Sequence, residues 1–307
     1  MEKIKLVSIV GPTASGKTAL SIAIAQKFNG EIISADSMQI YKEMDIATAK
    51  PDKKEMQGIV HHLMDFVNPE EEYSVAQFVR DARVVIKDIV SRGKLPVLVG
   101  GTGLYVNSLL NNVQFTEYNV DQKLRENLLK KSDDELLSTL KEVDFESYNK
   151  LSVEVNHKRI VRALEIYYQT GKPKSVVDRE ALSTPSPYDA IKIGLTAENR
   201  EYIYSRINLR VDLMVENGLL DEAKAMLNKK LSSTASKAIG YKEFLPYFEG
   251  KATLEECKEI LKRETRRYAK RQLTWFKRDK EINWIDIDKY DAQQLALKAT
   301  EIIKKEL

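Results

Sequence analysis

The segment at residues 11–18 constrains this chain most, because it reads GPTASGKT and matches the phosphate-binding loop pattern G-x-x-x-x-G-K-[ST]. An apolar run at residues 6–10 precedes it, and apolar residues at helical spacing follow from Ala19. The glycines let backbone N–H groups point at phosphate oxygens, while Lys17 adds positive charge and Thr18 suits Mg²⁺. We therefore expect a phosphate-binding α/β domain.

The loop predicts a binding site without naming a reaction. The residues expected to surround a diphosphate or nucleotide are Gly11, Pro12, Thr13, Ala14, Ser15, Gly16, Lys17 and Thr18. A nucleoside triphosphate is the common occupant, but any diphosphate offers similar oxygens. The chain has no clear second-strand acidic box of the ATPase type.

Short apolar runs rich in β-branched residues predict five strands, at residues 6–10, 31–35, 95–99, 190–195 and 282–287. Helical patterns separate several of them, which implies a parallel sheet. The clearest helix begins at Ser74, with Gln77 completing a capping-box pattern, and ends at Gly93. The predicted fold is α/β, a P-loop NTPase-like parallel sheet flanked by helices.

The strand signal disappears between about Asn112 and Pro187, where helix-favouring stretches occupy residues 121–142 and 156–169. We interpret residues 113–187 as an all-helical insertion into a catalytic core formed by residues 1–112 and 188–307. The pattern is helical again from Glu198 to Arg278, before the last strand and a terminal helix.

Composition excludes several classes of protein. With 49 Lys and Arg against 46 Asp and Glu, any nucleic-acid surface must come from local clustering of basic residues. The single cysteine, Cys257, excludes a disulfide within the chain and a cysteine-built zinc finger, and packing is its expected role. The start lacks a signal-peptide pattern, and no apolar run approaches the roughly 18 residues of a membrane span. We expect a cytoplasmic protein without a membrane partner.

An acidic residue, Asp36, directly follows the second predicted strand. Ligands and catalytic groups gather at the C-terminal edge of open parallel sheets. One interpretation is a general base that faces the phosphate loop; the other is a turn former after the strand.

Eight segments in order resemble the bacterial tRNA dimethylallyltransferase family, also called tRNA isopentenyltransferases. They are residues 11–18, 36–41, 45–51, 99–105, 158–165, 210–214, 237–242 and 267–275. The resemblance spans most of the chain. It implies transfer of a dimethylallyl group from dimethylallyl diphosphate to N6 of adenosine 37, 3′ of the tRNA anticodon, with Mg²⁺ and release of diphosphate. It also implies a monomer that binds the anticodon stem-loop.

The resemblance implies residue roles. The catalytic residues are Asp36, Thr13, Lys17 and Arg210, and Thr18 binds the metal. The residues implied to contact tRNA, with helical-insertion residues among them, are Asp36, Ser37, Met38, Gln39, Thr102, Arg125, Lys158, Arg159, Ile160, Val161, Arg162, Ser236, Lys237, Gly240 and Tyr241. Chemistry supports Asp36 as the base for the N6 proton, and Lys17 with Thr18 as groups that stabilise departing diphosphate.

Each assignment has a structural alternative. Thr13 can simply shape its turn, Thr102 can cap a helix, and the basic cluster at residues 158–162 can be a solvated face. Arg210 can pair with Asp212 or Glu216, and the sequence does not decide whether Arg206 or Arg210 contacts the diphosphate.

Two further patterns need an interpretation. The predicted helix at residues 266–278 has two stripes of side chains. One stripe can contact tRNA or diphosphate and consists of Arg267, Arg271, Thr274 and Arg278. The other can dock on the core and consists of Ala269, Leu273 and Phe276. The pair His61 and His62 is expected to be structural, because adjacent side chains point apart and no third metal ligand is evident.

Two competing functions remain open on the sequence. A nucleoside or small-molecule kinase also combines a phosphate loop with an aspartate at a strand end. A nucleotide-gated RNA-binding protein without catalysis is the alternative from another class.

Overall fold

The computed structural model describes residues 3–115 and 121–307. The chain divides into two compact units, which we call the core unit (Met1–Leu110 with Pro187–Leu307) and the insertion unit (Asn111–Ser186). Residues 116–120 of the expected insertion lie outside the described residues. Within the described residues, no helix is both long enough and apolar enough to cross a membrane.

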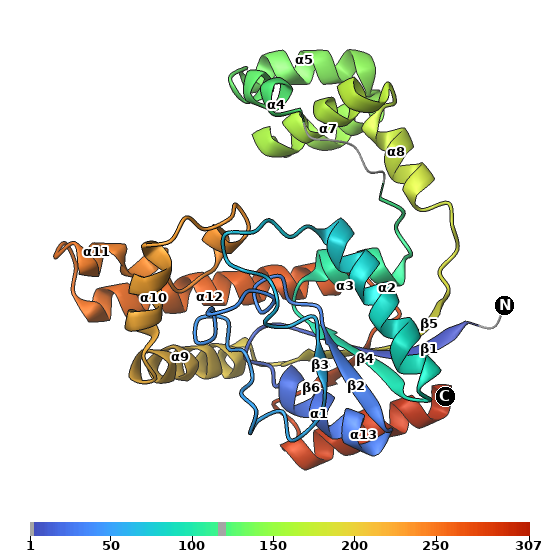
Figure 1. The fold of residues 1–307 in the computed structure, drawn as a ribbon, viewed down its shortest axis with the longest axis vertical. Helices are drawn as coiled ribbons and strands as arrows, with labels where there is room; N and C mark the ends of the chain where they lie inside the picture. Colours follow the sequence, from blue (N-terminus) through green and yellow to red (C-terminus); the bar gives the residue numbers. More distant parts are fainter. Residues whose placement is uncertain (1–2, 116–120) are drawn as a thin grey trace. The chain divides into compact units, whose positions relative to one another are not determined.

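The core unit is built on one parallel sheet of six strands in the order β3-β2-β4-β1-β5-β6 (Figure 1). The strands are β1 (Ile4–Val10), β2 (Gly30–Ser34), β3 (His61–His62), β4 (Leu95–Gly100), β5 (Tyr188–Thr196) and β6 (Asn283–Asp286). The predicted fold class is confirmed, and all five predicted strands are present. The sequence missed β3, because two residues are too few to show a strand pattern.

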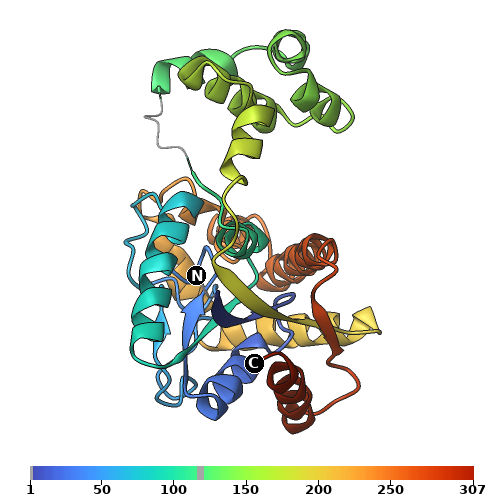
Figure 2. The same ribbon diagram turned by 90° about the vertical axis from the view of Figure 1, so that its right-hand side faces the viewer.

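Helices cover both faces of this sheet (Figure 2). In the core unit they are α1 (Lys17–Lys27), α2 (Val75–Ser91), α3 (Gly103–Leu110), α9 (Arg200–Glu216), α10 (Leu219–Leu227), α11 (Leu245–Phe248), α12 (Leu254–Phe276) and α13 (Ala292–Glu306). Two short 3₁₀ turns, η1 (Ala235–Lys237) and η2 (Lys242–Phe244), lie between α10 and α11. The capping box predicted at Ser74 is present at the start of α2.

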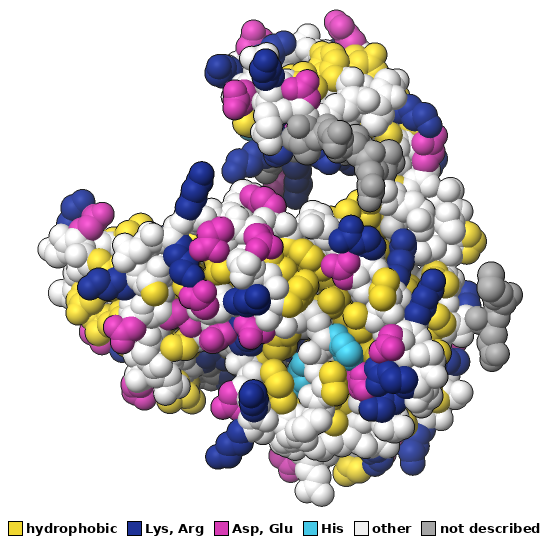
Figure 3. Space-filling model, in the orientation of Figure 1, with side chains coloured by type: hydrophobic (Ala, Val, Ile, Leu, Met, Phe, Trp, Pro, Cys, Tyr) yellow, Lys and Arg dark blue, Asp and Glu magenta, His cyan; other side chains and the backbone are white. Residues whose placement is uncertain are grey.

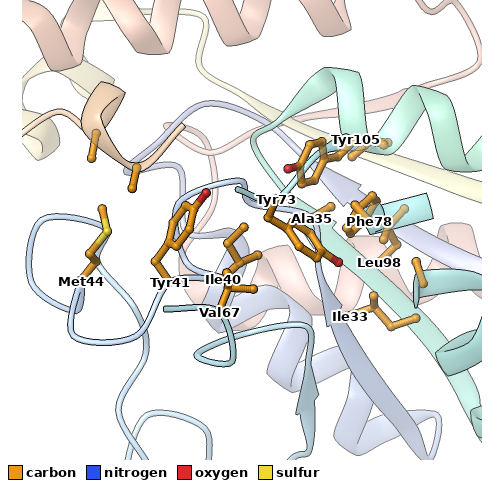
Figure 4. Close-up of a cluster of buried hydrophobic side chains, with 14 of the residues drawn as sticks. Ile33, Ala35, Ile40, Tyr41, Met44, Val67, Tyr73, Phe78, Leu98 and Tyr105 are labelled. Atoms are coloured by element: carbon orange, nitrogen blue, oxygen red, sulfur yellow. The ribbon is translucent and has the colours of Figure 1, made fainter. Parts of the chain in front are cut away.

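The alternation of side chains along β1 separates two hydrophobic clusters. Leu6 and Val10 belong to the cluster that includes residues of α2 and α3, whereas Val7 and Ile9 belong to the one with residues of α1 and α13. In the first cluster, Phe78 of α2 stacks on Tyr105 of α3 with ring centroids 4.4 Å apart (Figure 4). Both faces of β1 are thus buried, which fixes the strand that leads into the phosphate loop.

The long loop after β2 is held in place although it has little regular structure. Tyr41 and Met44 are completely buried in the hydrophobic cluster of Figure 4. The carboxylate of Glu222 on α10 accepts hydrogen bonds from the backbone N–H groups of Asp45 (2.9 Å), Ile46 (2.7 Å) and Ala47 (2.9 Å). The loop beside Asp36 is therefore fixed by side chains from α10 and the core.

The insertion unit is all-helical in its described residues. Its helices are α4 (Gln122–Leu129), α5 (Asp133–Val143), α6 (Phe145–Leu151), α7 (His157–Thr170) and α8 (Lys174–Ala181). The stretch expected at residues 121–142 forms two helices, because Ser132 and Glu135 make a capping box that starts α5. Leu128, Leu136, Leu140, Ile160, Val161, Ala163 and Leu164 form a separate hydrophobic core.

Candidate active site

The phosphate loop joins β1 to α1, and its two glycines are required by its shape. A Cβ on Gly11, whose φ is +148°, would lie 2.7 Å from the carbonyl oxygen of Leu195. Gly16 has φ +91° and directly precedes α1. The loop thus turns its backbone toward the N-terminus of a helix, which is a favourable place for an anion.

Positive charge is concentrated beside this loop. Lys17 donates a hydrogen bond to the carbonyl of Pro12 at 2.7 Å. Burial lowers the pKa of Lys17 to about 8, the negative charge of Asp36 opposes that shift, and the positive charge of Arg210 adds to it. Lys17 therefore interacts electrostatically with both Asp36 and Arg210, so the structure brings these three predicted residues together.

Two arginines of α9 reach the loop. Arg206 Nε donates to the carbonyl of Ala14 at 2.7 Å, and Arg210 Nη1 lies 3.4 Å from the hydroxyl of Thr13. Asp212, a possible ion-pair partner of Arg210, pairs with Lys258 and Lys262 instead. Both arginines thus lie against the phosphate loop, and the structure brings both Arg206 and Arg210 to it.

Asp36 lies after β2, beside the loop that follows β4. Its Oδ1 accepts a hydrogen bond from the backbone N–H of Met38 at 2.9 Å, so Asp36 forms a turn while its charge acts on Lys17. The hydroxyl of Thr102 accepts from the N–H of Ser37 at 3.0 Å. The strand order places β4 between β1 and β2, so three successive strand ends supply the site.

The sequence analysis missed Gln272 of α12. This side chain is 5% exposed, accepts a hydrogen bond from the backbone N–H of Thr13, and donates one to the carbonyl of Gly101. The available signal was a polar residue on the buried side of an amphipathic helix, between Ala269 and Phe276. Pattern alone could not indicate which groups it contacts.

Thr18 lies beside a small pocket of mixed polarity. The pocket is lined by Thr18, Ser21, Ser34, Gln39 and His61 together with the apolar residues Ile32, Pro51, Met64 and Val99. In the described part of the chain, no group of three or more His, Cys, Asp or Glu side chains is arranged to hold a metal. In loops of this pattern the Ser or Thr hydroxyl can ligate Mg²⁺ together with substrate phosphates, so Thr18 is the residue that would hold such an ion.

The two adjacent histidines contact different partners. His62 Nε2 lies 2.7 Å from Glu31 Oε2, and His61 Nδ1 lies 2.9 Å from the carbonyl oxygen of Ile59. Both residues form β3 at the sheet edge. The predicted structural role agrees with these contacts.

Among the tRNA-contact residues predicted in the core unit, Ser236 and Lys237 are exposed, but Tyr241 is not available. Tyr241 is 2% exposed, and its hydroxyl donates to Glu222 at 3.0 Å. A Cβ on Gly240 would lie 2.9 Å from the Cβ of Ala47. The Tyr241 side chain thus supports the loop after β2, so the tRNA contact predicted for this residue stays a prediction that its buried side chain does not support.

In the insertion unit, Lys158 and Arg159 are exposed in the first turn of α7, whereas Ile160 and Val161 are 0% and 2% exposed. The side chains of Ile160 and Val161 form part of the hydrophobic core of the unit, so the tRNA contacts predicted for these two residues stay predictions that their side chains do not support. Helical spacing turns only part of a contiguous segment toward solvent.

A buried carboxylate, Glu165, holds the other two predicted RNA-binding arginines of this unit. Arg125 Nε lies 3.3 Å from Glu165 Oε1, and Arg162 Nη1 lies 3.2 Å from Glu165 Oε2. The Glu165 side chain is 1% exposed, while those of Arg125 and Arg162 are 47% and 41% exposed. The arginines therefore neutralise a buried charge and still face solvent.

Arg125→Ala is expected to destabilise the protein by about 1–3 kcal/mol, because it leaves a buried carboxylate less completely paired. Adding Glu165→Gln should restore part of that loss, since the remaining group is neutral. Urea unfolding followed by circular dichroism measures both effects, with exposed Lys123→Ala on the same helix as the control. Equal stability of Arg125→Ala and the control would contradict the pairing.

Along α12 the two predicted stripes differ in exposure. Arg267, Arg271 and Thr274 are exposed, whereas Ala269 and Phe276 are buried and Leu273 is half-buried. Arg278 is also exposed but lies beyond the end of α12 at Phe276, so the helix is shorter than predicted. Figure 3 shows Lys and Arg side chains interspersed with Asp and Glu over the visible face of the core unit. Basic character is thus local, in line with the nearly balanced total charge.

Sequence comparison identifies the family. A model described as IPP transferase matches residues 39–279, and one described as isopentenyl transferase matches residues 4–71. The chain is 49% identical over 296 residues to a tRNA dimethylallyltransferase of Acetivibrio thermocellus, covering 94% of each chain. It is 47% identical over 294 residues to one of Caldanaerobacter subterraneus, covering 94% of this chain and 93% of the relative.

Solved structures agree. The tRNA isopentenylpyrophosphate transferase of Bacillus halodurans is 42% identical with a TM-score of 0.75, covering 99% of this chain and 97% of that one. A eukaryotic dimethylallyltransferase acting on tRNA is 34% identical with a TM-score of 0.84, covering 99% of this chain and 80% of that one. The resemblance recognised in the eight sequence segments is confirmed, and the chain belongs to the IPP transferase family.

Proposed function

We propose that this protein transfers a dimethylallyl group from dimethylallyl diphosphate to N6 of adenosine 37 in tRNA and releases diphosphate. One observation carries the proposal: in a member of the IPP transferase family, a phosphate loop with Lys17 interacts electrostatically with Asp36 at a neighbouring strand end. We further propose that the enzyme acts as a monomer in the cytoplasm, where its tRNA substrate is found.

On the donor side, the residues stabilise a leaving group. An allylic diphosphate ionises readily once the charge that develops on its bridging oxygen is stabilised. We assign this stabilisation to Lys17 and the two arginines of α9, which lie at the phosphate loop, together with backbone N–H groups of the loop. A good electrostatic contact of this kind contributes about 3 kcal/mol to the transition state.

Thr18 would hold Mg²⁺ through its hydroxyl, together with oxygens of the bound diphosphate. When bound, the ion supplies further charge stabilisation of the departing diphosphate. Thr13 contacts Arg210 and lies in the same loop, so its hydroxyl is placed on the donor side.

On the acceptor side, Asp36 takes the proton from N6. The exocyclic amine is a poor nucleophile because its lone pair is delocalised into the adenine ring, so proton removal must accompany bond formation. A positioned general base contributes about 10²- to 10⁴-fold to such a step. Ser37 and Thr102, which are hydrogen-bonded to each other, lie next to this carboxylate and can contact the base.

The target base must leave its stack to reach Asp36, which costs a few kcal/mol. We propose that tRNA contacts offset this cost. The exposed candidates are Ser236 and Lys237 in the core unit, and Arg125, Lys158 and Arg159 in the insertion unit; Arg162 is half-buried and is a further candidate. Met38 and Gln39 complete the proposed contacts near the base.

A kinase with the same loop would use ATP, and one assay separates the functions. Purified protein is incubated with unmodified tRNA, Mg²⁺ and either labelled dimethylallyl diphosphate or γ-labelled ATP. We expect label from the prenyl donor to appear on N6 of adenosine 37, identified by nuclease digestion and mass spectrometry.

A tRNA with guanosine at position 37 is the matched control, since guanine carries a carbonyl oxygen on C6 where adenine carries the N6 amine. Phosphate transfer from ATP without prenylation would contradict the proposal and favour a kinase. Binding of tRNA without transfer from either donor would favour the RNA-binding alternative.

A further inference from the structure

Gln272 is placed to align the two halves of the active site. It lies on α12, labelled in Figure 1, and reaches two loops that follow neighbouring strands. Its Oε1 accepts a hydrogen bond from the backbone N–H of Thr13 at 2.8 Å, and its Nε2 donates one to the carbonyl of Gly101 at 3.0 Å. One side chain therefore connects the phosphate loop to the loop after β4.

The two contacts require one acceptor and one donor at the end of the side chain, which the Gln272 amide supplies. The N–H of Thr13 needs an acceptor, and the carbonyl of Gly101 needs a donor, so only one orientation of the Gln272 amide satisfies both. Because Gln272 is 5% exposed, water is poorly placed to substitute for it. A Cβ on Gly101 would lie 2.0 Å from Nε2 of Gln272, so the amide leaves room only for glycine at this position.

Each connected loop carries a group assigned to one substrate. Thr13 contacts Arg210 on the donor side. Thr102 follows Gly101, and its hydroxyl holds the backbone of Ser37, the residue after Asp36. The bond to Gln272 also engages the N–H of Thr13, so this loop N–H is turned to the protein rather than to diphosphate.

We propose that Gln272 is a positioning residue that sets the alignment of the allylic diphosphate against the adenine acceptor. This inference rests on the proposed prenyl transfer. It predicts that loss of the amide slows the bond-forming step while each substrate still binds, because the separate binding contacts remain. A misplacement of reacting groups by about 1 Å can cost about 10²-fold in rate.

Two substitutions test the proposal. Gln272→Met has a similar size but makes neither hydrogen bond, and Gln272→Glu, when ionised, accepts from Thr13 but repels the carbonyl of Gly101. For both variants we expect kcat to fall about 10- to 100-fold. The Kd of the donor, measured by calorimetry without tRNA, and the Kd of tRNA should change less than about threefold.

The glutamate variant offers a sharper measurement. A protonated carboxyl presents one acceptor and one donor, as the glutamine amide does, and burial favours that neutral form. The ratio of kcat for Gln272→Glu to kcat for wild type should therefore rise as pH is lowered from about 8.5 to about 6. For Gln272→Met the same ratio should stay flat.

Neighbouring titratable groups do not imitate this result. They are Tyr268, one turn earlier on α12, and Asp36, Lys17 and Arg210 around the two loops. Burial raises the pKa of Tyr268 well above its ordinary value, so its hydroxyl, which also contacts Gln272, stays protonated over this pH range. Asp36, Lys17 and Arg210 are present in every variant, and Gln272→Met reports any change in their titration that follows from loss of the amide alone. Exposed Gln26→Met on α1, whose amide contacts only the Gln57 side chain at 3.0 Å, is the control for the loss of an amide.

The outcomes separate the two proposals. Absence of prenyl transfer by the wild type would refute the proposed function. An active wild type with unchanged kcat in both variants, or a loss confined to substrate affinity, would overturn the role of Gln272. If Gln272→Met does not fold, the pH response of Gln272→Glu decides alone, and a flat ratio overturns the inference.

Discussion

Asp36→Asn is expected to lower kcat by about 10²- to 10⁴-fold while the protein remains folded and binds tRNA. Asparagine removes the base but keeps an oxygen that can accept the hydrogen bond from Met38 N–H at 2.9 Å. The turn after β2 should therefore survive. Single-turnover prenyl transfer with saturating substrates measures the chemical step, and filter binding measures the affinity for tRNA.

The control is Asp52→Asn, an exposed acid in the same connection between β2 and β3. It carries the same loss of charge, and its side chain oxygen can still accept from the N–H of Glu55. Transfer by this variant should match that of wild type. If Asp36→Asn instead loses tRNA affinity to the same degree as activity, Asp36 contacts RNA and another group accepts the N6 proton.

The conformation of the phosphate loop was predictable because its information is local. The glycines and Lys17 of the loop lie within eight consecutive residues, and the apolar runs on either side indicate a strand and a helix. The position of Asp36 at a strand end was predicted in the same way, from its place after an apolar run. Both predictions concern where the backbone turns and where a strand ends at the edge of the sheet, and the spacing of residues in the sequence indicates both directly.

The missed features depend on contacts between distant segments. Gln272 lies 259 positions from Thr13 and 171 from Gly101, so no spacing rule connects them. Tyr241 was predicted to contact tRNA, but its side chain is buried and its hydroxyl donates a hydrogen bond to Glu222 of α10, which also accepts from the N–H of Ile46 in the loop after β2. A family motif identifies such residues without saying whether they contact substrate or hold the residues that do.

The insertion unit shows the same limit on a smaller scale. Its basic character was visible in the sequence, yet Glu165 could not be assigned to Arg125 before α4 and α7 were packed together. Arg125 therefore does two things: it neutralises the buried carboxylate of Glu165, and it presents positive charge to solvent. Measurements on that arginine must therefore separate stability from RNA affinity.

Lys17→Met is expected to lower kcat/KM for the donor by about 10²- to 10³-fold, because it removes a charge from the position where diphosphate departs. The aliphatic part of the side chain is retained, so the fold should tolerate the change. Lys27→Met, at the exposed far end of the same helix, is the matched control and should stay near wild type. A similar loss in both variants would contradict a specific role.

The lowered pKa of Lys17, to about 8 in the free protein, makes a second measurement possible. Diphosphate favours the protonated lysine, so bound donor raises this pKa; above the free value, binding must take up a proton. Donor affinity of the wild type should therefore fall up to tenfold per pH unit above about pH 8, whereas below it the affinity is level with respect to Lys17. Calorimetry without tRNA, at constant Mg²⁺, should show this decline in Lys27→Met but not in Lys17→Met. The same decline in Lys17→Met would mean that another group near the loop titrates and that Lys17 does not hold the leaving group.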